Sequence, residues 1–230
     1  MSRCRRDVLS RFALVSGIVL AGFVASSVRA TDAKMIPIPL QLPKAMFDGT
    51  PPVLKTAGLE KERPSDKPFM VPEDVVNVAL NKPVSSSDPE PTVGKLSQVT
   101  DGDKDAVEGS FVELGPGLQW VQVDLGKPHE IHAIMIWHFH KSARVYKAVV
   151  VQLADDKDFI TNVQTIYNND SENSAGLGVG TSRQYLDSCL GKLIPAGGEK
   201  ARFVRCYSKG NTVNDSNHYI EVEVWGKPAK

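Results

Sequence analysis

Histidine and cationic side chains gather near the middle of the chain, at one end of an apolar, strand-like run. His138 and His140 are two residues apart, so in a β-strand both point to the same face. Two imidazoles and a carboxylate could hold zinc, but no third ligand is near them, and His132 lies too far along the run to converge. The pattern therefore favours a hydrogen-bonding role over a transition-metal site.

The same segment supplies donors that suit a sugar. Imidazole and guanidinium groups donate to hydroxyl oxygens, and an aromatic face stacks on a pyranose ring. Because loops carry function more often than cores do, we expect ligand contacts here, with a solvated strand end as the alternative. The candidates are His138, His140, Lys141, Arg144 and Tyr146.

Two polar loops further along the chain are expected to complete the rim of this site. They span residues 168–181 and 209–218, and both are rich in Asn, Asp, Ser and Gly, which suit turns as well as polyol recognition. The expected contributors are Asn211, Asn214, Asn217 and His218.

The sequence lacks the local signatures of common catalytic sites. It has no Gly-x-Ser-x-Gly elbow, no paired histidines with helical spacing and no cysteine nucleophile beside a histidine. Scattered carboxylates could still pair in three dimensions, as in glycosidases, but no such pair is singled out. We therefore predict a non-catalytic binding protein and keep an enzyme as a weaker alternative.

The charge balance excludes two classes of partner. The whole chain has 27 basic and 27 acidic residues, and residues 1–30 contain five of the basic ones and one of the acidic ones. The rest of the chain then has 22 basic and 26 acidic residues, a net charge of −4. A mildly acidic protein without a basic stripe is expected neither to bind nucleic acid nor to use a polybasic membrane anchor.

Residues 1–30 have the features of an export signal. Basic residues precede an apolar run from Phe12 to Ala25, which is too short for a comfortable membrane span, and small residues end at Ala30. The pair Arg5-Arg6 resembles the bacterial twin-arginine signal, with an ordinary secretory peptide as an equal alternative. We expect a periplasmic or extracellular protein without a transmembrane segment in its mature chain.

Residues 31–74 are predicted to form an extended arm. Eight prolines interrupt this segment, so neither helical nor strand periodicity persists. The part from Met35 to Phe47 is more apolar than a spacer requires. We expect it to dock either on the domain that follows or on a protein partner.

From Val75 onward the sequence predicts β-strands. Polar and apolar residues alternate in 119–125 and 201–207, whereas both faces of 131–140 are largely apolar, as in a strand at the middle of a sandwich. Gly- and Pro-rich turns separate the strands, and no helical pattern of useful length appears. One all-β sandwich or jelly roll is expected over residues 75–228.

Two cysteines lie in this predicted β-domain, Cys189 and Cys206. They lack metal-ligand spacing, so we expect two buried thiols that act as small apolar residues. A single disulfide between adjacent strands is the alternative in an oxidising compartment.

Five motifs, in order, resemble the discoidin family, also called the coagulation factor 5/8 type C family. The resemblance covers residues 75–226 and implies a galactose-binding-like jelly roll. Members bind sugars, phospholipid head groups or proteins through loops at one end of the sandwich, and bacterial members most often accompany secreted carbohydrate-active enzymes. The motifs are NVALNKPVSSS (77–87), VTDGDKD (99–105), WVQVDLGKPHEI (120–131), ARFVRCYS (201–208) and YIEVEVWG (219–226).

The resemblance also implies a structural calcium ion. In related domains an Asp-Gly turn and a glutamate on the last strand hold the ion, and Asp101 and Glu221 stand at these positions. Ala106 stands where relatives often offer a hydroxyl, so a plain polar turn is the alternative. Further oxygens are expected from Thr100, Asp103 and Ile220.

Together these features predict an exported, non-catalytic module that binds carbohydrate in the cell envelope or outside the cell. The alternative is a protein-interaction or envelope-scaffold module that uses the segment from Met35 to Phe47. Variable loops choose the ligand in such a fold, so the sequence does not name it.

Overall fold

The computed structural model describes residues 34–50, 56–60 and 68–229. The predicted export signal lies outside these residues, as do three stretches of the arm, residues 31–33, 51–55 and 61–67. Helical structure in the described part is confined to one 3-10 turn, η1 (Leu96–Thr100), and no helix there is long and apolar enough to cross a membrane. The strands are β1 (Met35–Pro37), β2 (Met70–Pro72), β3 (Val76–Asn77), β4 (Val84–Ser86), β5 (Val112–Leu114), β6 (Gln119–His138), β7 (Val150–Ala154), β8 (Gln164–Asn168), β9 (Lys192–Ser208) and β10 (Asn217–Pro228).

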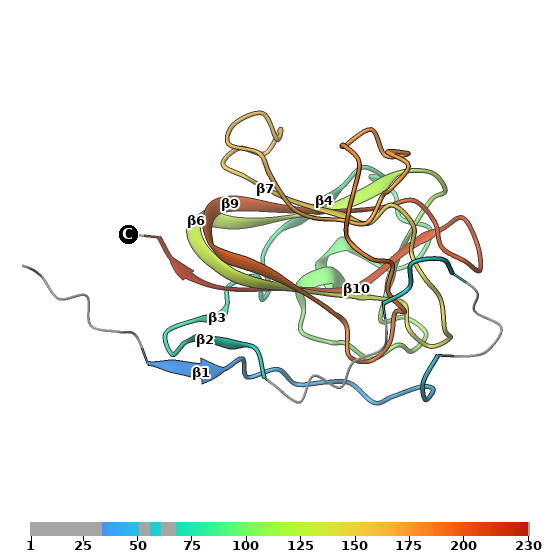
Figure 1. Cartoon of the computed structure of the whole chain (residues 1–230), viewed down its shortest axis with the longest axis horizontal. Coiled ribbons are helices and arrows are strands. Elements are labelled where there is room, and N and C mark those ends of the chain that lie inside the picture. The colour runs from blue at the N-terminus through green and yellow to red at the C-terminus, as the bar shows by residue number, and fades with distance from the viewer. Residues whose placement is uncertain (1–33, 51–55, 61–67, 230) are drawn as a thin grey trace, which may run out of the picture. The chain divides into compact units, whose positions relative to one another are not determined.

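Two long strands, β6 and β9, pass through both layers of the sandwich. They pair antiparallel along most of their length, and the register shifts where β6 bends, between Asp124 and His129. Gly126 stands in this bend with a φ of 83°, a backbone conformation that glycine adopts without steric cost. Figure 1 shows both strands folding back at this point, so that one half of each lies in each layer.

Each half of β6 organises its own layer. The half before the bend pairs with β4 and β9, and the layer continues through β7 to β8. The half after the bend pairs with β10, which also pairs with β3 and β5. All of these pairs are antiparallel, so the all-β sandwich predicted from the alternating pattern is confirmed.

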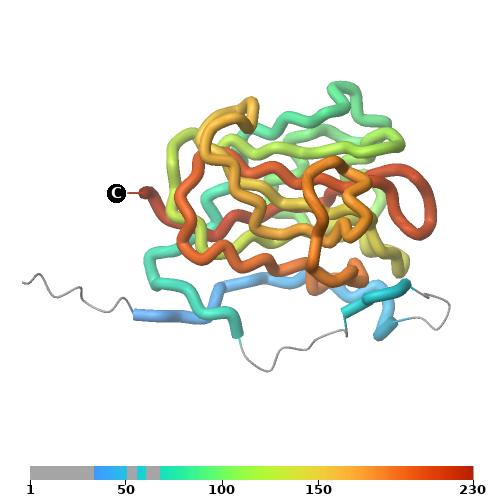
Figure 2. Tube along the Cα trace, turned by 45° about the horizontal axis from the view of Figure 1, so that its top comes forward, coloured from blue at the N-terminus to red at the C-terminus, as the bar shows by residue number. Residues whose placement is uncertain are grey.

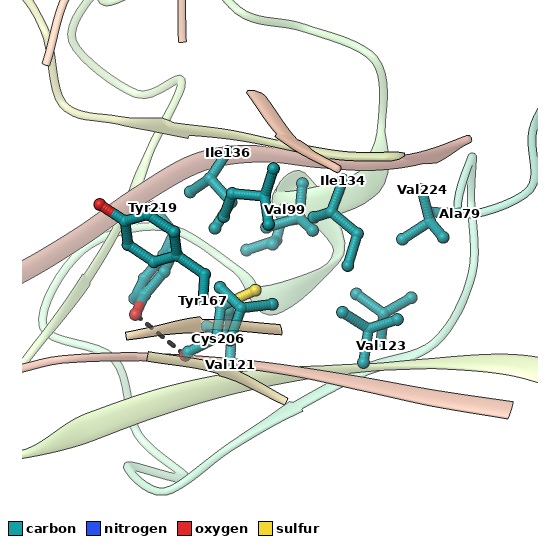
Figure 3. Close-up of a cluster of buried hydrophobic side chains, with 14 of the residues drawn as sticks. Ala79, Val99, Val121, Val123, Ile134, Ile136, Tyr167, Cys206, Tyr219 and Val224 are labelled. Atoms are coloured by element: carbon teal, nitrogen blue, oxygen red, sulfur yellow. Dashed lines mark hydrogen bonds between the residues drawn. The ribbon is translucent and has the colours of Figure 1, made fainter. Parts of the chain in front are cut away.

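The main core lies between the two layers. Val121 and Val123 of one layer face Ile134, Ile136 and Val224 of the other, and all five are at most 1% exposed (Figure 3). Burying each such side chain contributes about 1.5–3 kcal/mol to folding. This core fixes where the strands end, and therefore where the loops begin.

Cys206 lies in the same core as a thiol. Burial raises the pKa of this thiol to about 12, so it is un-ionised at neutral pH. Cys206 therefore acts as a small apolar side chain, as predicted, whereas Cys189 is only partly buried, so the prediction of two buried thiols is wrong for Cys189.

The N-terminal arm packs against the outer side of the β10 layer. β1 pairs antiparallel with β2, and Ile36 and Ile38 contact a second apolar cluster that includes Trp137 and Ile220. Figure 1 and Figure 2 both show the arm running alongside this layer. The apolar segment thus docks on its own domain, while Met35 remains 49% exposed.

Candidate functional site

A pocket of about 400 Å³ opens at the loop end of the sandwich, where β6 begins. Two of its walls come from loops 168–181 and 209–218, which the sequence predicted to form a rim. Figure 1 shows these loops on the side away from the bend of β6. The pocket is lined by Pro116, Gly117, Lys147, Ser174, Lys209 and Asp215.

Two lysines stand on neighbouring backbone segments in this lining. The Lys209 backbone N–H donates to the Lys147 carbonyl oxygen at 2.8 Å, and the Lys147 N–H donates to the Gly210 carbonyl at 3.0 Å. The Lys209 ammonium group donates to the Ser174 carbonyl at 2.8 Å, which joins loops 168–181 and 209–218. These bonds hold the bases of both lysine side chains in place beside the pocket.

Asn217 fixes the turn that forms another wall. Its amide nitrogen donates to the carbonyl oxygens of Gly115 (2.8 Å) and Gly117 (3.1 Å), and its amide oxygen accepts from Ser208 Oγ and the Gly210 N–H, both at 2.8 Å. Asn217 is fully buried. All four bonds lie inside the protein, so this residue positions the pocket and does not line it.

Asn211 has a similar supporting role in loop 209–218. Its amide nitrogen donates to Asn214 Oδ1 (2.6 Å) and the Ser216 carbonyl (2.9 Å), while its oxygen accepts from the Val213 and Asn214 N–H groups. Asn211 is 2% exposed. These bonds hold together the part of the loop that carries Asp215.

Loop 168–181 is also held by bonds within itself. The buried Asp170 carboxylate accepts from the Ala175 N–H at 2.7 Å, and the Asp170 carbonyl accepts from the Gly180 N–H at 2.8 Å. The Asn168 amide donates to the Gly178 carbonyl at 3.0 Å. Ser174 is therefore presented by an ordered loop.

A buried row of rings begins next to Lys147. The Tyr146 hydroxyl and His218 Nδ1 are 2.8 Å apart, the His138 ring stacks on Tyr146 with centroids 4.2 Å apart, and His138 Nδ1 is 3.0 Å from Asp187 Oδ1. All four side chains are buried. His138 Nε2 and Asp187 Oδ2 have no hydrogen-bond partner within the described residues.

His218 is uncharged in this network at neutral pH. Burial lowers its pKa to about 4, and the positive charge of Arg144 acts in the same direction. The Glu113 carboxylate, 3.5 Å from His218 Nε2, does not outweigh them. Burial also raises the pKa of Tyr146 far above its ordinary value, so the Tyr146–His218 contact is a hydrogen bond between neutral groups.

The remaining predicted contacts lie at the edge of this network. His140 Nε2 is 3.0 Å from the Lys104 carbonyl, and burial lowers the pKa of His140. Arg144 donates to Ser142 Oγ at 2.9 Å, and its guanidinium lies 4.8 Å from the Phe139 ring centroid. Lys141 is exposed.

The structure thus divides the nine predicted ligand contacts into two groups. Lys141 and Asn214 are exposed, whereas the other seven are buried and hydrogen-bonded or stacked within the protein. A direct ligand role for any of the nine stays a prediction. The buried seven are His138, His140, Arg144, Tyr146, Asn211, Asn217 and His218.

The residues that line the pocket were not singled out from the sequence. Lys147 and Lys209 each follow a buried residue, Tyr146 and Ser208, which is a weak sign of a strand end facing solvent. Their proximity depends on backbone pairing between segments about 60 residues apart. No local pattern in a single sequence reveals such pairing.

A second polar site joins the Asp-Gly turn to the last strand through Glu221. This side chain is fully buried; Oε2 accepts from the Gly102 N–H at 3.2 Å, whereas Oε1 has no hydrogen-bond partner within the described residues. Burial raises the pKa of Glu221 to about 9, and the nearby carboxylates of Glu223 and Asp101 act in the same direction. A buried, unpaired carboxylate oxygen fits a hard cation.

The other predicted calcium ligands lie next to Glu221 in the chain or in the segment whose Gly102 N–H donates to Glu221. Asp101 precedes Gly102, and Ile220 lies where a register shift interrupts the pairing of β10 with β6. Thr100 Oγ1 donates to the Lys82 carbonyl at 2.9 Å, and Asp103 Oδ1 accepts from the Asp105 N–H at 2.9 Å. These two side chains are already engaged, and the Thr100 carbonyl oxygen also accepts from the Asn81 N–H at 2.7 Å.

No cluster of three or more His, Cys, Asp or Glu side chains within the described ranges could hold a metal by itself. A cation at Glu221 would therefore depend on backbone oxygens for much of its coordination, which calcium accepts and zinc does not. The donor set fits calcium better than a transition metal.

Lys104 anchors the same turn without any ion. Its ammonium group lies 2.7 Å from Glu223 Oε1 and 5.4 Å from the centroid of the Trp137 ring. Glu223 Oε2 also accepts from Trp225 Nε1 at 3.0 Å. The turn is thus fixed to β10 at two points, one through Glu221 and one through Glu223.

Comparisons with known proteins find solved structures with a similar fold. Three solved structures similar to it are a family 89 glycoside hydrolase from Clostridium perfringens (20% identity, TM-score 0.50), chitosan-binding module 1 of a chitosanase/glucanase from Paenibacillus sp. IK-5 (20%, 0.46) and the fucose-binding module SpX-3 from Streptococcus pneumoniae (18%, 0.45). The matches cover 67%, 66% and 65% of this chain. They cover 15% of the glycoside hydrolase but 99% and 96% of the two modules.

The sequence comparisons find one family model that matches part of the chain. No curated protein matches the chain. A family model described as "NedA-like, galactose-binding domain", of the F5/F8 type C group, matches residues 98–186. The matched residues include the Asp-Gly turn and the whole of β6, which contributes one half to each layer. Residues 98–186 are therefore similar to the galactose-binding-like F5/F8 type C domain that the ordered sequence motifs indicated.

Proposed function

We propose that this protein is a non-catalytic carbohydrate-binding module that holds its ligand in the pocket at the loop end. The observation that carries the proposal is a pocket of about 400 Å³ whose walls come from four separate loops, each fixed by hydrogen bonds from buried residues such as Asn217 and Asn211. The galactose-binding description of the matching family supports the same ligand class.

The dimensions and the chemistry of the pocket suit a short saccharide. Small-molecule sites have volumes of roughly 300–1,000 Å³, so a pocket of about 400 Å³ has room for one or two sugar rings. Ammonium groups donate to sugar oxygens, the Asp215 carboxylate accepts from sugar hydroxyls, and Pro116 supplies an apolar surface. Pre-ordered walls lower the entropic cost of binding.

Filling the pocket tests this proposal. Ser174→Trp places a bulky ring on an exposed lining residue, whereas Lys127→Trp places the same ring on an exposed residue at the bend of β6. Calorimetric titration with a panel of oligosaccharides should show binding that is lost in Ser174→Trp and retained in Lys127→Trp. Binding that survives Ser174→Trp would place the ligand site elsewhere.

We further propose a structural calcium ion at Glu221. The support is the buried, unpaired Oε1 atom of Glu221 beside Asp101, together with the scarcity of side-chain ligands, which favours a cation that accepts backbone oxygens. Asp101, Glu221 and the Ile220 carbonyl would hold the ion, and its role would be to join the turn to β10. Equilibrium dialysis should find one calcium ion per chain, and none in Glu221→Gln; no uptake by the unmodified protein would refute the site.

The protein-interaction alternative has less structural support. Ile36, Ile38 and Leu40 of the arm already pack against the domain, which leaves fewer apolar side chains for a partner. Export to the periplasm or the cell exterior remains a prediction from residues 1–30.

A further inference from the structure

We infer that the pocket at the loop end selects an anionic saccharide, one that carries a carboxylate or a sulfate group. This inference rests on the proposed carbohydrate-binding function and adds the ligand's charge to it. Its basis is the set of charged groups that line the pocket and the absence of an aromatic ring from that lining.

The pocket lining carries more positive than negative charge. Its ionisable residues are Lys147, Lys209 and Asp215. Within the described residues, the Lys147 ammonium group has neither a hydrogen bond nor an ion pair, and no ion pair joins Asp215 to either lysine. Lys209 donates one N–H to the Ser174 carbonyl, which leaves two N–H groups for a ligand. One uncompensated cation and five free N–H donors thus face the pocket, in a protein whose chain without residues 1–30 has a net charge of −4.

Aromatic stacking, the usual source of affinity for neutral sugars, is not offered by the pocket. The nearest tyrosines along the chain, Tyr146 and Tyr207, are 1% and 6% exposed and are engaged with His218 and with Gln152. Pro116 provides an apolar contact but no π face. A neutral sugar would therefore depend on hydrogen bonds that replace equivalent bonds to water, which contribute little net affinity.

An anionic sugar can form stronger hydrogen bonds with the lysines of this pocket than a neutral sugar can. Charge-assisted hydrogen bonds from ammonium to carboxylate or sulfate are roughly twice as strong as neutral ones. The backbone bonds between the Lys147 and Lys209 segments keep the two ammonium groups on adjacent supports, so one anionic group can be reached by both side chains. Asp215, on the same lining, opposes the anion and limits its affinity.

The test compares charged and uncharged sugars of the same parent. Calorimetric titrations with oligogalacturonate, with a sulfated galactose oligosaccharide and with neutral galacto-oligosaccharide should show at least tenfold tighter binding of one or both acidic sugars. Whichever acidic sugar binds identifies the anionic group. The affinity should fall about three- to tenfold between 50 and 300 mM salt, because ions screen exposed charges.

Three variants and one control make the outcome specific. Lys147→Gln and Lys209→Gln should each weaken acidic-sugar binding about three- to tenfold, and Asp215→Asn should strengthen it by about twofold or more. Lys127→Gln removes an exposed charge at the bend of β6 and should leave the affinity unchanged. Weaker binding by the two lysine variants together with tighter binding by Asp215→Asn is not expected from a general loss of folding.

Different outcomes would refute the charge preference and the carbohydrate-binding function. Equal or tighter binding of the neutral sugar, blocked by Ser174→Trp, would overturn the charge preference and leave carbohydrate binding intact. Absence of binding by every sugar, charged or neutral, would overturn both.

Discussion

The loop end of the sandwich contains two polar regions that differ in what their side chains contact. The buried region, which includes Asn217 and His218, bonds almost entirely to other parts of the protein. The pocket lining, which includes Lys147 and Asp215, lies at the surface and has groups without partners. Polar residues at a loop end can therefore be separated into those that build a site and those that can contact a ligand.

The largest effect is expected in the buried region. Asn217→Ala removes four hydrogen bonds and leaves buried partners unsatisfied, so the free energy of unfolding should fall by about 3–4 kcal/mol. Ser174→Ala, at an exposed side chain of the lining, is the matched control and should change it by less than about 0.5 kcal/mol. Urea unfolding followed by fluorescence measures the free energy of unfolding of both variants. Similar losses would contradict the distinction between the buried region and the pocket lining.

Calcium should have the next largest effect, through Glu221. Calcium at 100 times its dissociation constant should raise the free energy of unfolding by about 2.7 kcal/mol, and Glu221→Gln should abolish this increase. Without calcium, the two proteins should be about equally stable at pH 7, because the raised pKa of about 9 keeps Glu221 protonated and similar in shape to glutamine. A calcium-induced increase in the free energy of unfolding that persists in Glu221→Gln would mean that the ion binds at another site.

Acid should weaken the buried region through His218. The folded-state pKa of about 4 lies below the ordinary value of 6.5, so between these pH values the unfolded chain binds more protons. Stability is therefore full above pH 6.5 and should fall by about 2 kcal/mol as the pH drops to 5. The measurement is unfolding at several pH values for the unmodified protein and His218→Gln; the variant should lose this part of the pH dependence, and parallel curves would contradict the assignment.

The smallest effect on stability is expected in the lining. Lys147→Gln should change the free energy of unfolding by less than about 0.5 kcal/mol, because this exposed side chain forms no bond within the described residues. Thermal melting at neutral pH checks this. A loss above about 1 kcal/mol would mean that Lys147 belongs to the supporting structure and would undermine its assignment to the ligand.

Much of the fold could be predicted from the sequence because burial repeats with the period of a strand. Alternation over Trp120 to Leu125 correctly predicted which side chains enter the core, and the two apolar faces of Ile131 to His138 match a strand covered on both sides. The sequence predicted that the apolar arm docks on this domain or on a partner, but it did not indicate which of the two, or which face of the domain is covered. That arrangement depends on contacts between segments distant in the chain.

The candidate site was predictable only in part. Loops 168–181 and 209–218 were correctly placed at one end, because their composition is typical of turns. Residue type alone could not separate Asn217 from Asp215, since both are polar and two residues apart. Their difference arises from the turn at Gly115–Gly117, which approaches from a distant part of the chain and engages the Asn217 amide.

Nuclear magnetic resonance can show whether the pocket at the loop end holds a saccharide. Isotope-labelled protein would be titrated with the oligosaccharide that binds best, and the amide shifts mapped onto the chain. We expect the largest shifts at Gly117, Lys147, Ser174 and Lys209, with little change at Lys127 in the bend of β6. Shifts confined to the bend or to the arm, with the pocket amides unchanged, would contradict this expectation.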